Sequence, residues 1–312
     1  MWIFPSALKK QGFLGINRRN FAYISRYNTR SRYPLVDDKL KTKLQAEKFS
    51  VTTPRLRGVI RRQYEIASFP GLVENLDGFA VKPSKGAGGK GILVITGRRG
   101  DLFVKSSGKT MDVHDVKRHL SNILAGLYSL AGTPDVAIIE DLIRPVEMLE
   151  KLSYEGVPDI RIIVFMGYPV MAMLRLSTRA SDGKANLHKG AVGVGLGIAT
   201  GKCLHAVQHS NRVTLHPDTG MALDDIAVPD WQNLLVLASR SHEITRLGYV
   251  GADLVVDRDR GPLLIELNAR PGLAIQVANG TGLLPRLKKI EKLDPDLIPP
   301  AEKRVKYSMN AF

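Results

Sequence analysis

Residues 251–257 (Gly-Ala-Asp-Leu-Val-Val-Asp) and 262–268 (Pro-Leu-Leu-Ile-Glu-Leu-Asn) determine which architecture this chain can adopt. Both runs are short and mostly aliphatic, so together they predict two adjacent β-strands. Glu266 and Asn268 are two positions apart, and their side chains therefore leave the same face of a strand. Asp253 can supply a third oxygen, and two carboxylates with an amide suit Mg²⁺ or Mn²⁺. The alternative is a hairpin with a polar outer face.

Residues 79–95 predict two strands joined by a glycine-rich turn. Lys82 lies in the entering strand, where its ammonium can reach a phosphate. The turn has bare backbone N–H groups that can approach phosphate oxygens, at Gly86, Gly88, Gly89 and Gly91. A P-loop is excluded because no Gly-Lys-Ser/Thr opens a helix here, and a Rossmann fingerprint is excluded as well. The alternative is a flexible hairpin with solvated lysines.

Further candidates for nucleotide contacts follow the glycine turn along the chain. Residues 136–143 predict a buried strand that ends at two acids, the second being Asp141, and backbone at such a strand end can bind adenine. Glu147 follows as a possible acceptor for a ribose hydroxyl. Asp159 and Arg161 share one face of a further strand, so Arg161 can clamp a phosphate or carboxylate.

Two more arginines and one asparagine complete the candidate site. Arg175 and Arg270 are candidates for binding substrate carboxylates. Asn186 opens the segment Asn-Leu-His-Lys-Gly-Ala, a polar loop that can close over a reacting centre. An ordinary surface loop is the alternative interpretation of that segment.

In this order, the motifs resemble the ATP-grasp superfamily. Within it the chain is most similar to the ribosomal-protein glutamate ligase branch, and more narrowly to the bacterial α-L-glutamate ligase-like proteins. The narrower likeness rests on residues 15–20 (Gly-Ile-Asn-Arg-Arg-Asn), on 33–43 (Tyr-Pro-Leu-Val-Asp-Asp-Lys-Leu-Lys-Thr-Lys) and on 186–190. The resemblance covers roughly residues 15 to 290.

The resemblance implies an α+β fold, in which two α+β lobes hold nucleotide and metal between them, with a reduced N-terminal region. It places nucleotide contacts on Lys82, Gly86, Gly88, Gly89, Gly91, Asp141, Leu142 and Asp159. The family's loop asparagine falls on Asn186, and its magnesium ligands fall on Asp253, Glu266 and Asn268.

Four parts of the chain are predicted. They are a basic N-terminal arm (1–36), a small lid lobe with a leading helix (37–135), a large lobe with the metal site (136–290) and a tail (291–312). Helices are predicted over 37–49, 113–130 and 231–247. Ligases of the resembled branch usually carry a whole domain before the Asp-Lys-Leu segment, so a partner protein that completes the site is a further expectation.

The charge of the chain is strongly positive, with 45 Lys and Arg against 30 Asp and Glu. The first 36 residues contain no acid, and we expect them to pack on the body; a transit peptide or a membrane-surface element are the alternatives. Nucleic acid is an unlikely partner, because no zinc spacing or RNA motif accompanies the charge. No apolar run is long enough to cross a bilayer and Cys203 is the only cysteine, which favours a cytoplasmic protein.

These motifs predict an ATP-dependent carboxylate–amine ligase that forms an amide through an acyl phosphate. Its substrates would be an amino acid such as glutamate and an amine, peptide or protein acceptor, with ATP and Mg²⁺ or Mn²⁺ as cofactors. The alternatives are a ligase of small metabolites and a non-catalytic ATP-binding subunit of a membrane-associated complex. An oligomer is possible.

Overall fold

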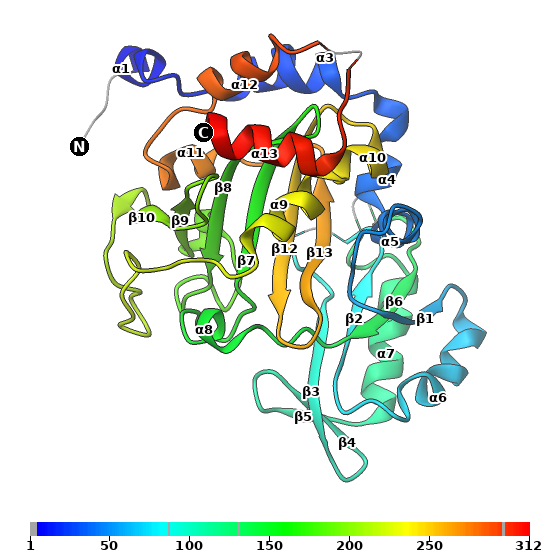
Figure 1. Cartoon of the computed structure of the whole chain (residues 1–312). Coiled ribbons are helices and arrows are strands. Elements are labelled where there is room, and N and C mark those ends of the chain that lie inside the picture. The colour runs from blue at the N-terminus through cyan, green and yellow to red at the C-terminus, as the bar shows by residue number, and fades with distance from the viewer. Residues whose placement is uncertain (1–4, 87, 130–131, 295–296) are drawn as a thin grey trace. The chain divides into compact units, whose positions relative to one another are not determined.

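The computed structural model describes residues 5–86, 88–129, 132–294 and 297–312. The chain forms two compact units: the smaller comprises residues 38–40 and 54–143, and the larger comprises 1–37, 41–53 and 144–312. Each unit has its own antiparallel sheet with helices packed on it (Figure 1), which confirms the predicted α+β class.

The smaller unit contains a six-stranded sheet in the order β1-β6-β2-β3-β4-β5. Its strands are β1 (Leu56–Ile60), β2 (Phe79–Pro83), β3 (Leu93–Arg99), β4 (Leu102–Lys105), β5 (Thr110–Met111) and β6 (Ala137–Asp141). Its helices are the 3₁₀ helix η3 (Gln63–Ser68), α6 (Phe69–Val73) and α7 (Val113–Leu124). The predicted division after residue 135 therefore differs from the structure, because β6 pairs with β1 and β2.

Helix α7 has defined ends. Asp112 caps its first turn by accepting a hydrogen bond of 2.8 Å from the backbone N–H of Asp115. The helix ends before the predicted residue 130, because Gly126 adopts φ +82° and its ideal Cβ would lie 2.4 Å from the carbonyl oxygen of Thr133. Leu130, the last residue of the predicted helix, lies outside the described residues.

The larger unit contains a seven-stranded sheet in the order β11-β10-β9-β8-β7-β12-β13. Its strands are β7 (Asp159–Phe165), β8 (Tyr168–Leu176), β9 (Val192–Leu196), β10 (Cys203–Gln208), β11 (Asn211–Arg212), β12 (Tyr249–Asp257) and β13 (Gly261–Asn268). The two strands predicted over 251–257 and 262–268 are β12 and β13, paired antiparallel, with a bulge after Asp253.

The remaining helices are short. Those near the N-terminus are α1 (Pro5–Lys10), α2 (Ile16–Arg18), the π-helix η1 (Arg19–Ile24), α3 (Ser25–Tyr27), η2 (Arg30–Arg32), α4 (Pro34–Asp37) and α5 (Lys39–Lys48). Those that follow are α8 (Glu147–Glu150), η5 (Leu187–Lys189), α9 (Trp231–Ser239), α10 (Ser241–Thr245), α11 (Ala274–Ala278), α12 (Leu284–Ile290) and α13 (Ala301–Ala311). The helix predicted over 231–247 is thus split into α9 and α10.

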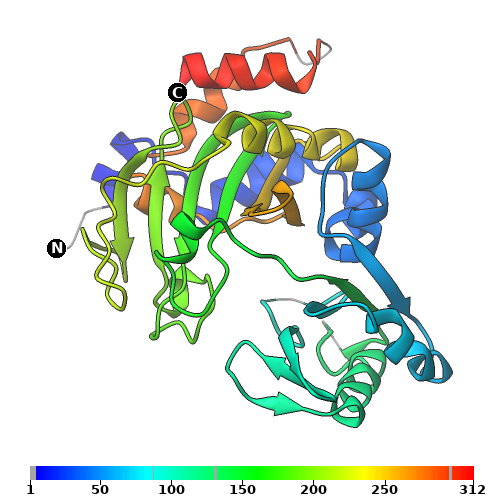
Figure 2. The ribbon, with the colours of Figure 1, turned by 60° about the horizontal axis from the view of Figure 1, so that its bottom comes forward.

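Each face of the larger sheet is buried by a different set of helices. One face packs Ile162 and Ala252 against Leu235 of α9, and the other packs Phe165 and Tyr249 against Tyr23 of the N-terminal arm. Figure 2 shows α9 and the N-terminal helices on opposite sides of β7 and β8. Alternate residues of a strand face opposite sides, so this burial fixes which side chains share the face that carries the candidate site.

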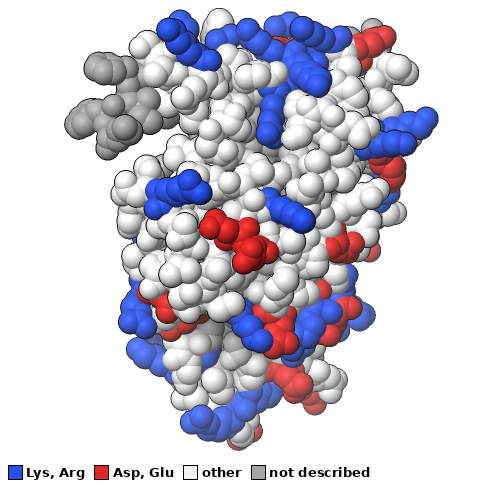
Figure 3. All heavy atoms as spheres, turned by 60° about the vertical axis from the view of Figure 1, so that its left-hand side comes forward, with Lys and Arg blue, Asp and Glu red and all other residues white. Residues whose placement is uncertain are grey.

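The basic arm packs on the larger unit, as predicted. Leu14, Tyr23 and Ile24 are buried in its core, while the arm's cationic side chains stay at the surface. In Figure 3 Lys and Arg side chains line the upper edge, the edge at which Figure 1 shows α1 and α12. Within the described part of the chain, no helix is long and apolar enough to span a membrane.

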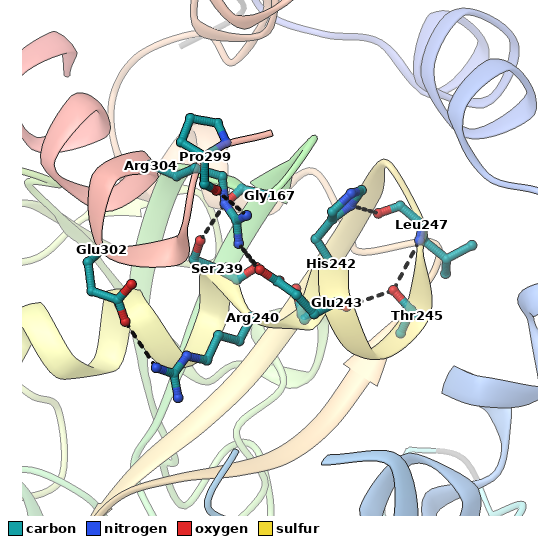
Figure 4. A network of polar contacts seen from close by, with 11 residues as sticks. Gly167, Ser239, Arg240, His242, Glu243, Thr245, Leu247, Pro299, Glu302 and Arg304 are labelled. Atoms are coloured by element: carbon teal, nitrogen blue, oxygen red, sulfur yellow. Dashed lines mark hydrogen bonds and ion pairs between the residues drawn. The ribbon is translucent and has the colours of Figure 1, made fainter. Parts of the chain in front are cut away.

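The predicted tail over 291–312 requires correction, because residues 301–311 form helix α13. Arg304 is 1% exposed and donates hydrogen bonds to the carbonyl oxygens of Gly167 and Pro299, at 3.0 and 2.8 Å. It also pairs with Glu243 of α10 at 2.6 Å and contacts Ser239 of α9 (Figure 4). A buried guanidinium with this many acceptors fastens the helix to the body of the unit.

Candidate active site

Five charged side chains share one face of four neighbouring strands in the larger unit. Arg161 on β7 lies opposite Asp253 on β12, and Asp253 lies opposite Glu266 on β13. Asp159, two residues before Arg161 on β7, lies opposite Arg175 on β8. Spacing by two along a strand keeps both rows on the same face, so the register assembles the predicted residues into one cluster.

Asp253 is the centre of this cluster. Its carboxylate accepts from Nε and Nη2 of Arg161 at 2.7 and 2.6 Å, and from Nη2 of Arg175 at 2.9 Å. Arg175 also donates through Nε to Asp159. Asp253 is 5% exposed and Arg175 8%, so both charges are buried, and each is compensated by its partners.

The two buried carboxyl groups of the cluster have different proton affinities. Burial raises the pKa of Asp159 to about 6, an effect that Arg175 opposes and the negative charge of Asp253 reinforces. Burial also acts on Asp253, but Arg161 and Arg175 outweigh it and lower the pKa of Asp253 to about 2. At neutral pH Asp253 is therefore charged, and Asp159 is the member whose pKa lies closer to neutrality, at about 6.

The predicted metal ligands Asp253, Glu266 and Asn268 leave the same face of β12 and β13. Their oxygens form the kind of hard donor set that Mg²⁺ prefers. Asp253 offers four lone-pair positions, and three accept the arginine hydrogen bonds, so one position remains on Oδ1 for a cation. Among the described residues, no cluster of three His, Cys, Asp or Glu side chains could hold a metal, and Asn268 contributes an amide oxygen to the predicted set.

Arg161 and Arg175 each keep donors for a ligand. Each guanidinium uses Nε and Nη2 for its carboxylate partners. No residue that the structure describes accepts from Nη1 of either one, so this nitrogen can face an oxyanion while the ion pairs stay intact.

Arg270 lies in the loop that follows β13. Its backbone N–H donates to Oδ1 of Asn268 at 2.8 Å. Its exposed guanidinium stacks over the ring of Tyr33, 5.3 Å from the ring centre. The prediction of a cation beside the metal face is compatible with this position, whereas its stacking partner on the arm was not foreseen.

Asn186 is the N-cap of the short helix η5. Its Oδ1 accepts from the backbone N–H of His188 at 3.0 Å, and the turn ends at Gly190, with φ +101°. The carbonyl of Gly190 accepts from Thr178 and Gln208, at 2.9 and 2.8 Å. These hydrogen bonds hold the C-terminal end of the loop in place. The role of Asn186 at a reacting centre stays a prediction.

Lys82 lies on β2 of the smaller unit and is paired with Glu140 of β6. Lys82 Nζ donates to Oε2 of Glu140 at 2.7 Å, and both side chains are buried. The register places Lys82 opposite Ile138, one strand away and two residues before Glu140. We predicted Lys82 as a phosphate ligand; its partner Glu140 was missed, because sequence alone does not give cross-strand register.

The glycine turn joins β2 to β3, which are paired antiparallel, as predicted for a strand, turn and strand. Gly88, Gly89 and Gly91 have φ values of +63°, +74° and +74°, a region that side-chain-bearing residues rarely adopt. Gly86 is instead buried and bridges to Ser129. Backbone conformation therefore favours glycine at three of the four predicted phosphate-binding positions, and at Gly86 an ideal Cβ would lie 2.3 Å from Cγ of Pro83.

The predicted adenine and ribose contacts lie on separate segments. Asp141 ends β6 and pairs with Arg57 of β1, an arginine that the sequence did not single out. Leu142 follows at a half-buried position in the same unit. Glu147 begins α8 of the larger unit, is exposed and pairs with Lys151 at 2.6 Å. Their roles toward a nucleotide stay predictions.

Comparison with solved structures finds several similar chains. D-cycloserine synthetase DcsG has 14% sequence identity, coverage of 87% of this chain and 71% of that chain, and a TM-score of 0.48. D-alanyl-alanine synthetase A from Vibrio cholerae O1 biovar eltor str. N16961 has 9% identity, coverage of 89% and 66%, and a TM-score of 0.49. ATP-grasp ligase PsnB, complexed with a phosphomimetic variant of a minimal precursor, Mg and ADP, has 13% identity, coverage of 85% and 62%, and a TM-score of 0.45. The chain thus spans less than two thirds of the length of PsnB.

A comparison with curated proteins finds no match. A family model described as sugar-transfer associated ATP-grasp matches residues 18–292, a range that includes every candidate site residue described above. This match confirms the predicted superfamily and the ATP-grasp fold, and the narrower likeness to glutamate ligases stays a prediction. The chain belongs to the sugar-transfer associated ATP-grasp family.

Proposed function

We propose that this protein is an ATP-dependent carboxylate–amine ligase that joins an amino acid such as glutamate to an amine, peptide or protein acceptor. The observation that carries the proposal is the row Arg161, Asp253 and Glu266 on three adjacent strands, in a chain of the ATP-grasp family. Asn268 completes an all-oxygen donor set beside two arginines whose Nη1 groups have no acceptor among the residues that the structure describes. Side chains of this kind bind phosphates, carboxylates and a hard cation.

The reaction has two steps. An oxygen of the substrate carboxylate attacks the γ-phosphorus of ATP, the bond from that phosphorus to the bridging oxygen breaks, and ADP leaves. The amine nitrogen then attacks the acyl carbon of the acyl phosphate, the carbon–oxygen bond breaks, and phosphate and a proton leave as the amide forms. No enzyme nucleophile is needed, so catalysis consists of positioning and electrostatic stabilisation.

The residues of each unit take defined roles in this scheme. In the larger unit Arg161 and Arg175 neutralise the developing negative charge through Nη1, while Asp253 and Asp159 hold the two guanidinium planes. In the smaller unit Lys82 and the N–H groups of the glycine turn bind phosphate oxygens. Glu266, Asn268 and one lone pair of Asp253 would hold Mg²⁺ or Mn²⁺, which supplies charge neutralisation when bound.

Mass spectrometry of products tests this proposal. The purified protein is incubated with Mg-ATP and with pooled amino acids, peptides and cell extract, beside Glu266→Ala and Asp259→Ala. Asp259 is the matched control, because it is an exposed acid on the same hairpin. We expect an amide with stoichiometric ADP from the wild type and Asp259→Ala, and a loss of about 100-fold in Glu266→Ala, since a bound cation contributes several kcal/mol.

Two other outcomes would contradict parts of the proposal. Normal Mg-dependent turnover by Glu266→Ala would remove Glu266 from the metal site. Binding of ATP by the wild type without ADP or a new amide would instead favour the non-catalytic ATP-binding subunit.

A further inference from the structure

The acid-free N-terminal arm is hydrogen-bonded to two segments beside the candidate site. These are the start of β12 and the loop that follows β13. Asn28 donates through Nδ2 to the carbonyl oxygens of Tyr249 and Ala269, at 2.7 and 3.3 Å, and accepts from the N–H of Tyr249 at 2.8 Å. The N–H of Gly248 donates to the carbonyl oxygen of Tyr27 at 2.9 Å. One buried asparagine thus joins the start of β12 to the loop that follows β13.

That loop folds back over the face of the sheet on which the site lies. Gly251 is two residues from Asp253 on the same face, opposite Asn268. An ideal Cβ at Gly251 would lie 2.7 Å from Cβ of Pro271, so the ring of Pro271 covers this position. Pro271 therefore lies beside the proposed metal ligands, against the face of the sheet that carries them.

Arg19 of the arm contacts Pro271. Its Nη1 donates to the carbonyl oxygen of Pro271 at 2.8 Å, and its Nε and Nη2 donate to Oδ1 of Asn20 at 3.1 and 2.8 Å. These three bonds use three of the five guanidinium N–H groups, which leaves one on each Nη nitrogen. Both acceptor atoms are neutral, and no carboxylate in the described ranges pairs with Arg19.

Arg270, which belongs to this loop itself, carries a second guanidinium that has no acidic partner among the described residues. Arg270 precedes Pro271, and its side chain stacks on Tyr33 of the arm. Across the part of the chain that the structure describes, no hydrogen bond or ion pair of the Arg270 guanidinium is found. Arg19 thus binds the loop at residue 271 and Arg270 belongs to the same loop, and neither is paired with an acid in the described residues, whereas Arg161 and Arg175 are already balanced by Asp159 and Asp253.

We propose that Arg19 and Arg270 bind a second carboxylate of the substrate, one that does not react. The substrate class is then an acid with at least two carboxylates, with one facing the arginines of the strand cluster and the other facing the loop. This inference rests on the proposed ligase function and specifies its substrate. The chemistry favours it because the planar guanidinium donors of both residues match a carboxylate, and Arg19, which is half-buried, gains from an anionic ligand.

A purely structural role for Arg19 is the competing explanation. Three hydrogen bonds to Pro271 and Asn20 could serve only to hold the arm against the loop. That role predicts a loss of stability on substitution and no change in the preference of the protein for dicarboxylates. Binding measurements without nucleotide distinguish the two roles.

Succinate, glutarate and adipate are the probes, because they place two carboxylates at different separations, and butyrate is the single-carboxylate reference. We measure their dissociation constants by calorimetry and ligand-observed NMR for the full chain. For the best dicarboxylate we expect binding about tenfold tighter than that of butyrate, the effect of one or two charge-assisted hydrogen bonds. In Arg19→Gln this ratio should fall to about one, and Arg19→Lys should be intermediate.

Arg18→Gln is the matched control, since Arg18 is an exposed neighbour in the same basic segment. It should keep the wild-type ratio. Unfolding temperature and circular dichroism establish that each variant is folded. An unchanged ratio in folded Arg19→Gln, or dicarboxylates that bind the wild type no better than butyrate, would overturn the proposal.

Two further measurements distinguish failure of the substrate assignment from failure of the ligase function. Inorganic phosphate that competes for the site and loses affinity in Arg19→Gln, while dicarboxylates bind no better than butyrate, would identify a phosphate subsite and overturn the carboxylate assignment. Mg-ATP binding and ADP formation are measured separately. Their absence in the wild type contradicts the ligase function, whereas intact ATP chemistry without a dicarboxylate preference contradicts only the substrate class.

Discussion

Arg161 and Asp253 face each other across β7 and β12 and are joined by two hydrogen bonds, of 2.7 and 2.6 Å. The pair is buried, and Asp253 also holds Arg175. Asp253 therefore orients two guanidinium groups, of which Arg175 is also held by Asp159. A reaction that places negative charge on this face meets arginines whose planes are already fixed.

Replacing the shared carboxylate should destabilise the protein strongly. We expect Asp253→Asn to lower the free energy of unfolding by about 3–5 kcal/mol, because it leaves buried guanidinium charge uncompensated. Urea unfolding measures this change. Glu302→Gln is the control, since the pair of Glu302 with Arg240 is partly solvated and should contribute less than about 1 kcal/mol. Equal changes in the free energy of unfolding would show that the buried Asp253 network contributes no more to stability than a partly solvated ion pair.

The carboxyl group of Asp159 should titrate with a pKa of about 6, well above its usual 3.8. Its folded-state pKa is raised, so the folded protein binds more protons than the unfolded chain between about pH 4 and 6. The contribution of Asp159 to stability therefore decreases as pH rises through this window. Carbon-13 NMR of the carboxyl carbon, assigned with Asp159→Asn, gives the pKa directly. A midpoint near 4 would contradict the assignment.

Asp253 should show the opposite dependence on pH. Its pKa is lowered to about 2, so its contribution to stability is present above its usual 3.8 and is lost as pH falls toward 2. In Asp253→Asn the pKa of Asp159 should fall, because a neighbouring negative charge is removed while Arg175 remains. An Asp159 pKa that stays near 6 in this variant would leave burial as its only cause.

Lys82 should contribute to ATP affinity through its charge. We expect Lys82→Met to weaken Mg-ATP binding by about 10- to 100-fold, the range for a charge-assisted hydrogen bond. Glu140→Gln should retain the affinity, because the ammonium stays and its buried carboxylate partner becomes neutral. Lys109→Met is the exposed control on the same unit. Fluorescent-nucleotide titration measures all three, and unchanged affinity in folded Lys82→Met would remove Lys82 from the nucleotide site.

The last helix should matter for stability and not for chemistry. Arg304→Met removes the guanidinium that joins Gly167, Ser239 and Glu243, and we expect a loss of about 3–5 kcal/mol in the free energy of unfolding. Lys303→Met, at the exposed neighbouring position, should change it by less than about 0.5 kcal/mol. At temperatures where Arg304→Met remains folded, its Mg-ATP affinity should match the wild type.

The sequence was sufficient for side chains whose placement depends on one strand. Alternation in β13 put Glu266 and Asn268 on one face, and the same rule related Asp159 to Arg161. It was insufficient for partners, because the pairing of Asp159 with Arg175 and of Lys82 with Glu140 depends on the register between strands. Register is set by the whole packed sheet.

Helix α13 shows a different limit. Pro299 and Pro300 suggested a tail, yet proline is tolerated where a helix begins. The buried positions Ala301, Arg304, Val305 and Ser308 do follow the helical spacing of three and four. Two of these four are polar, so the pattern does not register as an apolar stripe, and only the acceptors on α9, α10 and residue 167 explain the burial of Arg304.

The contacts of Asn28 have a consequence for synthesis of the chain. Asn28 and Tyr249 are 221 residues apart, which at about 5–20 residues per second is on the order of 10 to 45 seconds of translation. Phe165, one ring partner of Tyr23, is made earlier, but until Tyr249 and Ala269 have emerged from the ribosome the side chain of Asn28 lacks the backbone groups that it binds. The arm is made long before the strands on which it docks, so a nascent chain lacks the Arg19 contact with Pro271, and with it this edge of the site, until residue 271 has emerged.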